Sequence, residues 1–433
     1  MDGKFSGLLG IVVILFITYL CSSDRKNIPW KTVAWGLGLQ IVFAVCILGI
    51  PRYGVPGIFR FVFSALNDLV NDLVGFTDAG ADFVFGPLGR PDSPGGFIFA
   101  FRALPTIIFF SSLTAVLYHL GLLQKVVKGI ALLLQKTMRA SGAELLSTAA
   151  NIFVGQTEAP LIVKPYIERM TRSEILCIMV GGMATVAAGV MAAYVNMLKG
   201  RVPDIAGHLL TASFMAAPGT IMISKMLLPE REVPETMGMV QMGTEKLDSN
   251  VIEAAARGAA EGLQLALNVA AMLIAFIALI TLFDSVLGWA GAQFGFAHWG
   301  HHFAFPGDTV TAPRLSFSLM LGWLFAPLSW LLGIPWAESP LIGKLLGEKL
   351  ILNEFVAYVH LSQVGAKLSD RSVIICSYAL CGFANFASIG MQIGGIGTMA
   401  PNQRPTLARL GLLSVLGGSL TCYLLAAIAG LLF

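Results

Sequence analysis

The chain alternates long apolar stretches with short polar connections, and this pattern predicts a bundle of membrane-crossing helices. A helix needs about 20 predominantly apolar residues to cross the hydrocarbon core of a bilayer. About eight stretches are long and apolar enough, so we expect about eight transmembrane helices. They run over residues 5–22, 31–50, 97–120, 174–198, 204–227, 254–288, 370–396 and 405–432.

One segment, residues 55–85, has a different periodicity. Polar and apolar side chains recur at helical spacing on opposite sides of it. The polar set is Arg60, Ser64, Asn67, Asp68, Asn71 and Asp72, and the apolar set is Ile58, Phe61, Val62, Leu66, Leu69 and Leu73. This pattern predicts an amphipathic helix that lies along the membrane interface and does not span it. Residues 293–314, with their histidines and prolines, are interpreted as a loop outside the membrane.

Two further stretches, 121–170 and 336–366, are apolar but too interrupted to cross as single helices. Each carries a polar break at its centre, GQTE at 155–158 and NE at 353–354. Irregular backbone at membrane depth is tolerated where protein or a water-filled cavity satisfies its polar groups. We therefore predict two re-entrant hairpins.

The two hairpins belong to a longer repeated pattern. Each is followed by a charged turn, at 170–174 and 368–372, and then by an apolar span with a small-polar cluster, GGMATVAAGV and CGFANFASIG. Such duplication is the sequence signature of transporters built from inverted repeats. The predicted division is a scaffold with the first three spans and the interfacial helix, a first transport repeat, span 6 with a connecting region, and a second transport repeat. Their boundaries are 1–120, 121–227, 228–335 and 336–433.

Composition agrees with an all-α polytopic membrane protein. Of the 433 residues, 56% are hydrophobic and 12% are charged, which lies outside the range of soluble domains. The formal net charge of +3 and the lack of a basic run argue against a nucleic-acid partner. Arg25, Lys26 and Lys31 lie between the first two apolar stretches, so the positive-inside rule places the N-terminus outside the cytoplasm.

The polar breaks carry the candidate chemistry. An ionisable group at bilayer depth costs roughly 2.5–3.5 kcal/mol, so it persists mainly where it faces a cavity, an ion or a partner. In an inverted repeat the two hairpin tips and the two punctuated spans meet near the midplane. We expect one cavity there that binds a small neutral ligand rich in hydroxyl and amide-like groups, with Val190 and Phe383 as apolar walls for a ring. The polar residues predicted to line it are Gln156, Thr157, Glu158, Glu354, Asn385 and Ser388.

A second constellation suits a cation. The side-chain oxygens of Asn151 and Thr185, with the backbone carbonyls of Val154 and Val186, would form a cage of neutral oxygens. Sodium fits such a cage better than calcium, which recruits several carboxylates. An alternative interpretation of comparable weight is that the Thr185 hydroxyl bonds back to its own helix.

The motifs GQTEAPLIVKPY, TRSE, NEFVAY and CGFANFASIG resemble those of the concentrative nucleoside transporters, particularly bacterial sodium-coupled members. The resemblance implies a homotrimer whose protomers have eight spans, two re-entrant hairpins and an interfacial helix. By similarity, Gln156, Thr157 and Glu158 would address the nucleobase. The remaining implied contacts are Glu354, Asn385 and Ser388 with the ribose, and Val190, Leu265 and Phe383 with the base.

The family's sodium site maps onto Asn151, Val154, Thr185 and Val186. A bacterial member carries serine where this chain has Thr185, and the hydroxyl is retained. The resemblance therefore predicts a symporter in the inner cell membrane that imports nucleosides such as uridine with sodium by alternating access.

Three other functions are compatible with buried carboxylates. A proton-coupled nucleoside symporter, in which Glu158 or Glu354 titrates, is the nearest alternative. An intramembrane hydrolase is disfavoured because no Ser-His-Asp, Cys-His, aspartyl or zinc signature is present, and we therefore expect no enzymatic activity. A passive channel would lack gradient-driven accumulation.

Overall fold

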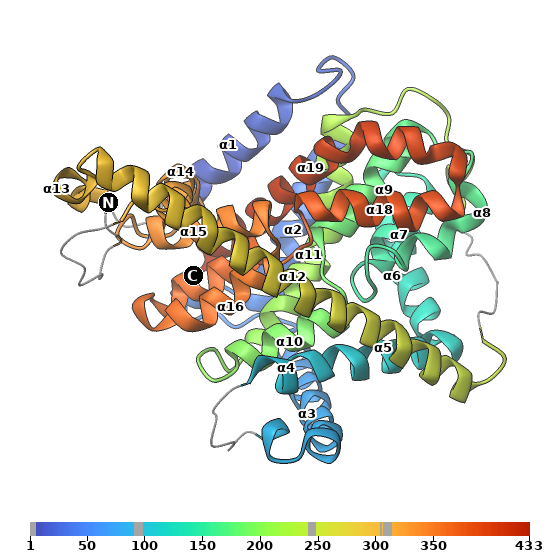
Figure 1. Cartoon of the computed structure of the whole chain (residues 1–433). Coiled ribbons are helices and arrows are strands. Elements are labelled where there is room, and N and C mark those ends of the chain that lie inside the picture. The colour runs from blue at the N-terminus through green and yellow to red at the C-terminus, as the bar shows by residue number, and fades with distance from the viewer. Residues whose placement is uncertain (1–5, 91–97, 241–247, 304, 306–313) are drawn as a thin grey trace.

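The computed structural model describes residues 6–90, 98–240, 248–303, 305 and 314–433. Apart from two isolated bridges, the regular structure of these residues is helical (Figure 1). This confirms the predicted all-α class. In chain order the α-helices are α1 (Ser6–Leu20), α2 (Trp30–Leu48), α3 (Arg60–Phe85), α4 (Phe99–Arg102), α5 (Leu104–His119), α6 (Leu122–Met138), α7 (Gly142–Ala150), α8 (Lys164–Ile167), α9 (Arg172–Ala184), α10 (Ala188–Leu198), α11 (Ile205–Leu227), α12 (Val251–Gln293), α13 (Phe296–Trp299), α14 (Phe317–Leu331), α15 (Ser339–Ile351), α16 (Glu354–Val364), α17 (Asp370–Leu380), α18 (Phe386–Met399) and α19 (Arg404–Leu432).

Within the described residues, six helical stretches are long and apolar enough to cross a membrane, and each matches a predicted span. They are 30–48, 100–119, 172–198, 205–227, 251–293 and 401–432. α1 is apolar but shorter, and the predicted span 370–396 is divided into α17 and α18. α14 is a further short apolar helix that the sequence pattern did not predict, and Pro327 interrupts its interior.

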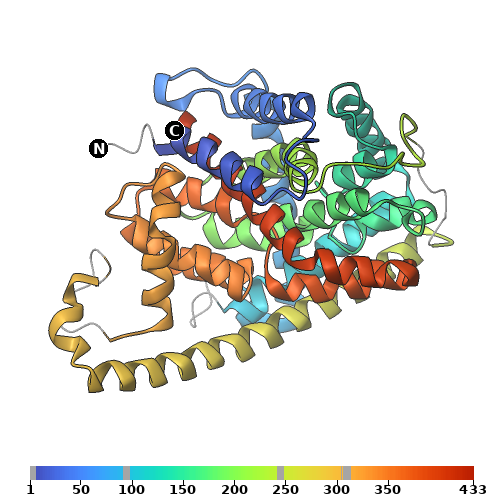
Figure 2. The same ribbon diagram turned by 90° about the horizontal axis from the view of Figure 1, so that it is seen from above.

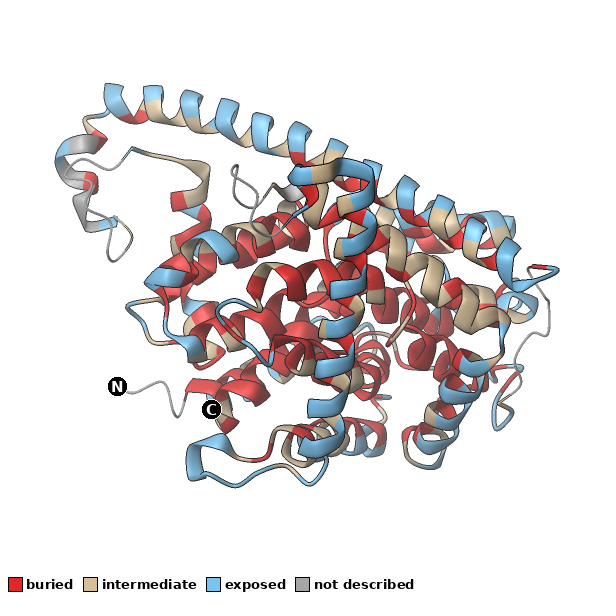
Figure 3. Cartoon of the chain, turned by 90° about the horizontal axis from the view of Figure 1, so that it is seen from below, coloured by how far each residue is buried: buried red, intermediate tan, exposed pale blue. Residues whose placement is uncertain are grey.

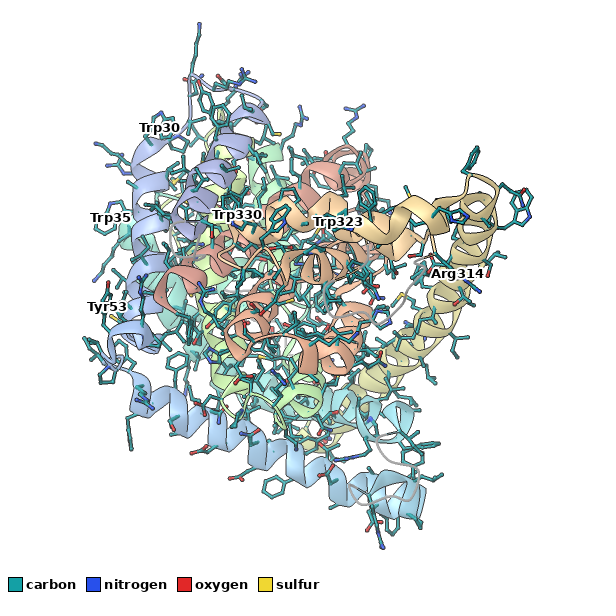
Figure 4. All side chains as sticks on the ribbon, turned by 90° about the vertical axis from the view of Figure 1, so that its left-hand side faces the viewer. Trp30, Trp35, Tyr53, Arg314, Trp323 and Trp330 are labelled. Atoms are coloured by element: carbon teal, nitrogen blue, oxygen red, sulfur yellow. The ribbon has the colours of Figure 1, made fainter. Side chains whose placement is uncertain are left out.

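Burial divides the molecule into a packed body and an exposed periphery. α9, α10, α11 and α19 are buried along almost their whole length. The buried residues gather in the interior of the body (Figure 3). α12 runs along one edge of the molecule (Figure 2) and buries only a narrow stripe, mainly against α5. Trp30, Trp35 and Tyr53 project from the outer side of the region around α2 (Figure 4). An apolar outer surface of this kind is expected where lipid replaces water.

Close packing of α12 on α5 depends on two glycines. A Cβ at Gly258 would meet the Ala115 Cβ at 2.6 Å, and one at Gly262 would meet the Ile108 Cα at 2.8 Å. The Ser112 hydroxyl also donates to the Ala255 carbonyl at 2.9 Å. Small residues allow two backbones to approach closely in this way. The α5–α12 pair therefore forms a distinct wall beside the body.

The amphipathic segment forms α3, as predicted, but the predicted orientation of Asn67 is wrong. The Asn67 side chain is 6% exposed, and its Oδ1 accepts a hydrogen bond from the Gly207 amide of α11 at 3.2 Å. By contrast Phe61 and Phe83 are 85% and 91% exposed. Asn67 lies inward because it satisfies a donor in the first turn of a neighbouring helix. The apolar residues of α3 are divided, since Phe61, Leu69 and Phe83 are exposed whereas Val70, Val74 and Ala81 are buried.

Both charged turns act as helix starts. Thr171 accepts from the Glu174 amide at 3.1 Å while Glu174 accepts from the Thr171 amide at 2.9 Å, which is a capping box. In the second turn Ser369 caps α17 by accepting from the Ser372 amide at 3.3 Å. The spans that follow break at corresponding places, between α9 and α10 and between α17 and α18. Both predicted interruptions are present. The region 293–314 contains the short helical turns of 296–303, and residues 304 and 306–313 of that prediction lie outside the described residues.

Candidate functional site

The N-termini of two helices, α16 and α18, lie close together within the body. Both helices come from the C-terminal part of the chain. Asn353 begins α16, and its Oδ1 accepts from the Val356 amide at 2.9 Å. Asn385 begins α18, and its Oδ1 accepts from the Ser388 amide at 2.9 Å. Asn is among the preferred residues at this capping position. The free amides of both first turns are therefore held in the same region, where they favour an acceptor.

Glu354 is held by neutral donors and not by a cation. Its Oε2 accepts from Asn385 Nδ2 at 3.2 Å, and its Oε1 accepts from the Tyr194 hydroxyl at 3.0 Å. The carboxylate is 3% exposed. Among the residues that the structure describes, no Lys, Arg or His forms an ion pair with Glu354 or Glu158. Such a carboxylate has lone pairs left for the hydroxyl groups of a neutral ligand.

Gln156 connects the first break to the second. Its Nε2 donates to Ser388 Oγ at 3.3 Å, and its Oε1 accepts from Gln392 Nε2 at 3.1 Å. Gln156 is 6% exposed and Ser388 is fully buried. The structure therefore brings Gln156, Glu354, Asn385 and Ser388 into one hydrogen-bonded group.

Two adjoining cavities border this group. A small one of about 90 Å³ is lined by Gln156, Thr157, Glu158, Val190, Leu265, Glu354, Phe383 and Asn385, among others. A larger one of about 390 Å³ shares Thr157, Glu158, Val190 and Leu265 with it and extends along α5 and α12 to Arg257, Glu261, Gln264 and Asn268. Of the predicted ligand-binding residues, Ser388 is the one that borders neither cavity, and it is reached through Gln156. A third cavity of about 440 Å³ lies between α3 and α11 and contains none of them.

The predicted sodium ligands also lie at two facing breaks. The Ala188 amide donates to the Phe153 carbonyl at 3.1 Å, which ties the break after α7 to the break before α10. Asn151 is fully buried, and its Oδ1 has no hydrogen-bond partner in the described part of the chain. A buried acceptor without a donor requires an explanation, and coordination of a cation by this oxygen is one such explanation.

The other three predicted ligands also have oxygen lone pairs available. The described residues provide no hydrogen-bond donor for the carbonyls of Val154 and Val186. The Thr185 hydroxyl donates to the Gly181 carbonyl at 2.9 Å, as the alternative interpretation required, yet its lone pairs are still available to a cation. All the candidate ligands are neutral oxygens, which suits a monovalent ion, and no cluster of His, Cys, Asp or Glu capable of holding a metal occurs in the described ranges.

Tyr194 and Gln392 were not predicted from the sequence as site residues. Tyr194 stands in an apolar helix and carries no motif of its own. Gln392 follows Asn385 by seven residues and Ser388 by four, which is the spacing of one helix face. That spacing was the available signal for Gln392, whereas the partner of Tyr194 lies 160 residues away.

Known families match the chain along most of its length. A family described as "Na+ dependent nucleoside transporter N-terminus" matches residues 9–88, one described as "Nucleoside recognition" matches 100–201, and one described as "Na+ dependent nucleoside transporter C-terminus" matches 208–430. The chain belongs to the concentrative, Na⁺-dependent nucleoside transporter family. This confirms the predicted family, and with it a multi-pass membrane transporter and not an enzyme.

Relatives in this family include bacterial and mammalian proteins. An uncharacterized transporter of Haemophilus influenzae is 43% identical, over 98% of this chain and 97% of its own length. Solute carrier family 28 member 3 of Rattus norvegicus is 38% identical over 99% of this chain, which spans 58% of that longer protein. Sodium/nucleoside cotransporter 1 of Mus musculus is 38% identical over 98% of this chain and 63% of its own.

Solved structures of the transporter CNTnw have the same fold. The inward-facing, substrate-bound structure is 41% identical, covers 99% of this chain and 98% of its own, and superposes with a TM-score of 0.86. A two-site variant of CNTnw in an outward-facing state is also 41% identical, with the same coverage and a TM-score of 0.88. The fold is thus that of a concentrative nucleoside transporter.

Proposed function

We propose that the protein is a symporter that carries nucleosides across the inner cell membrane, coupled to a sodium gradient, by alternating access. The observation that carries the proposal is the group formed by Gln156, Glu354, Asn385 and Ser388 beside one cavity. It combines a carboxylate with neutral amide and hydroxyl groups, and it includes no Lys or Arg that would favour an anion. A nucleoside supplies the complementary ribose hydroxyls and base edge.

The ribose is assigned to the end of the cavity at Glu354 and Asn385. A carboxylate accepts from hydroxyl groups, and the N-terminal amides of α16 and α18 donate to their oxygens. The base is assigned to the end at Gln156, Thr157 and Glu158. Its ring would pack against the apolar residues Val190, Leu265 and Phe383, which line the same cavity.

The sodium ion is assigned to the cage of Asn151, Val154, Thr185 and Val186. The unpartnered Oδ1 of Asn151 supports this assignment. Asn151 and Val154 of the cage lie on the same break as the base-binding Gln156, within six residues. Binding of the ion would therefore order the segment that contacts the base, which provides a physical basis for coupling.

Alternating access requires one part of the protein to move against another. The two transport repeats, 121–227 and 336–433, contribute most of the site, and α12 contributes Leu265 from the opposite wall. We assign α3, α5 and α12 to the scaffold. Large apolar side chains of α12, including Ile274, Leu282 and Phe283, are exposed, and they fit a trimer interface or lipid. The N-terminus is assigned to the outside of the cytoplasm on the positive-inside rule.

The energy of one sodium ion is sufficient. A membrane potential of 100 mV provides about 2.3 kcal/mol per charge, and a tenfold sodium gradient adds about 1.4 kcal/mol. Their sum, about 3.7 kcal/mol, supports accumulation of a neutral substrate by a few hundredfold.

Uptake of labelled uridine into proteoliposomes at constant pH tests the ion. We expect uptake with external sodium and little uptake when choline replaces it. The rival is a proton-coupled symporter, which is favoured by the position of Glu158 on the cavity wall. Undiminished uptake in choline that rises as the external pH falls would contradict sodium coupling and support the proton.

A further inference from the structure

Gln392 contacts the predicted base-binding residue Gln156 and is fully buried. Its Nε2 donates to the Met179 carbonyl at 2.9 Å and to Gln156 Oε1 at 3.1 Å. These two bonds use both hydrogens of the amide nitrogen. Gln392 therefore links the backbone of α9 to the side chain of Gln156.

The Met179 carbonyl determines which way both amides point. A backbone carbonyl only accepts hydrogen bonds, so Gln392 must turn its nitrogen toward Met179. The same nitrogen then faces Gln156, so Gln156 must present its side-chain oxygen to accept the hydrogen bond. The orientation of the Gln156 amide is thereby fixed by the Met179 carbonyl oxygen, which cannot become a donor.

With its oxygen engaged, Gln156 directs its nitrogen to the cavity side. This nitrogen donates to Ser388 Oγ at 3.3 Å and faces Met391 Sδ at 3.8 Å. Met391 lines both cavities. Because a thioether is a weak acceptor, a ligand atom that accepts a hydrogen bond more strongly would replace it.

We propose that Gln392 is a positioning residue that holds the Gln156 amide with its nitrogen toward the substrate, so that the transporter recognises an acceptor atom on the base. This inference rests on the proposed nucleoside transport. It narrows the substrate class to ribosides whose ring carries a carbonyl oxygen or an unprotonated ring nitrogen at the edge facing Gln156.

Two further observations support a dedicated arrangement. A Cβ at Gly182 would meet Gln156 Cβ at 2.6 Å and Gln392 Nε2 at 2.9 Å, so both glutamines pack directly on this glycine. In addition, Gln392 Oε1 is buried without a partner. An apolar residue would avoid that unsatisfied acceptor. The amide therefore contributes through its two donors.

The test is a double-mutant cycle on full-length protein in proteoliposomes. We expect Gln392→Met to raise the KM for labelled uridine about tenfold, the effect of losing one well-placed hydrogen bond, with little change in kcat or in the half-saturating sodium concentration. In a Gln156→Ala background the same substitution should raise KM no further, because Gln392 acts through Gln156.

A ligand without a base acceptor provides the second readout. Phenyl C-riboside keeps the ribose and an aromatic ring but carries no acceptor on the ring. Wild-type protein should bind it, as a competitor of labelled uridine, about tenfold more weakly than uridine. Its inhibition constant should be the same in wild type and in Gln392→Met.

Gln403→Met is the matched control. Gln403 is also a buried glutamine whose Nε2 donates to backbone carbonyls, those of Ile167 at 3.3 Å and Met170 at 3.1 Å, but it borders neither cavity of the site. Its KM for uridine should stay near the wild-type value. The inference is overturned if wild type binds phenyl C-riboside as tightly as uridine, or if Gln392→Met weakens both ligands by the same factor. Wild-type protein that carries no uridine would instead refute the proposed function and this inference with it.

Discussion

The Tyr194 hydroxyl donates a hydrogen bond to Glu354 Oε1 at 3.0 Å and thereby joins the two predicted repeats across the candidate site. Tyr194 comes from α10, just after the break in the first repeat, and Glu354 is the first residue of α16 in the second. The Tyr194 ring stacks on Tyr358 at a centroid distance of 3.9 Å and meets Phe355 edge-on at 5.4 Å. Packing therefore fixes the phenol, and the phenol fixes the carboxylate.

Substitution Tyr194→Phe should weaken nucleoside binding and leave ion binding intact. It removes a hydrogen bond to a charged acceptor, an interaction of about 1.5–3 kcal/mol, so we expect the KM for uridine to rise by roughly tenfold or more. The half-saturating sodium concentration should not change. Tyr358→Phe is the control, because its hydroxyl donates to the Ser377 carbonyl at 2.7 Å and not to the site. Equal KM values for the two variants would argue against the positioning role of Tyr194.

Glu354→Gln tests whether this carboxylate binds the ribose. The amide retains the shape but replaces an acceptor oxygen with a donor nitrogen. We expect uridine uptake, as kcat/KM, to fall by about tenfold or more. The preference of wild type for uridine over 2′,3′-dideoxyuridine should shrink in the variant, since the lost contact is to a hydroxyl. A preference that survives unchanged would place the ribose elsewhere.

Much of this architecture could be predicted from the sequence because the breaks have a local cause. Glycine and proline around Gln156 disfavour regular helix, and Thr171 and Ser369 are strong N-caps. The repetition of the whole pattern predicted that Glu354 and Asn385 would lie near the first break. The hydrogen bond from Gln156 to Ser388 at 3.3 Å, and the cavity that Gln156, Glu354 and Asn385 line together, agree with that expectation.

What escaped prediction depends on tertiary contacts. Asn67 has the periodicity of a polar surface residue, but the amide of Gly207 draws it inward. Tyr194 resembles any aromatic residue of an apolar helix until its partner is known. The sequence also contains no sign that Gln392 bonds a carbonyl of α9. In each case the contact partner is distant in sequence, and the sequence alone does not identify it.

Asn151→Ala should weaken sodium binding selectively. It removes the buried Oδ1 that has no protein partner, together with the Nδ2 that donates to the Ser147 carbonyl at 3.1 Å. We expect the half-saturating sodium concentration for uridine uptake to rise by about tenfold or more. The uridine KM at saturating sodium should remain within about twofold. Sodium dependence that is unchanged in both Asn151→Ala and Thr185→Ala would refute the assigned cage.

The buried ion pair between Glu144 and Lys225 should matter for stability and not for substrate choice. Lys225 Nζ lies 2.6 Å from Glu144 Oε1, with side chains 6% and 0% exposed, and ties α7 to α11. Glu144→Ala leaves the buried cation with Glu230, at 3.3 Å, as its remaining ion-pair partner and should cost up to about 3–5 kcal/mol. Thermal unfolding in detergent measures this loss. Glu235→Ala, in the exposed Arg169–Glu235 pair, should cost less than about 1 kcal/mol.

We expect the stability of the protein to depend on pH because Asp248 forms an ion pair with Arg257. Arg257 donates to it at 2.7 and 2.9 Å and lowers its pKa below the usual value of 3.8. A group whose pKa is lowered by folding stabilises the protein above its unfolded pKa, and the contribution is lost as the pH falls through the folded pKa. Asp248→Asn should therefore lower the unfolding temperature at about pH 6 and have a smaller effect at an acidic pH below the usual pKa of 3.8. A difference that is the same at both pH values would contradict this assignment.

Uphill accumulation of uridine tests the central claim most directly. Proteoliposomes containing the wild-type protein are given an inward sodium gradient and an inside-negative potential, and labelled uridine is measured inside and outside at steady state. We predict an internal concentration well above the external one, and collapse of that ratio when a sodium ionophore removes the gradient and the potential is clamped at zero. An internal concentration that only equals the external one under the imposed gradient would contradict sodium-coupled transport.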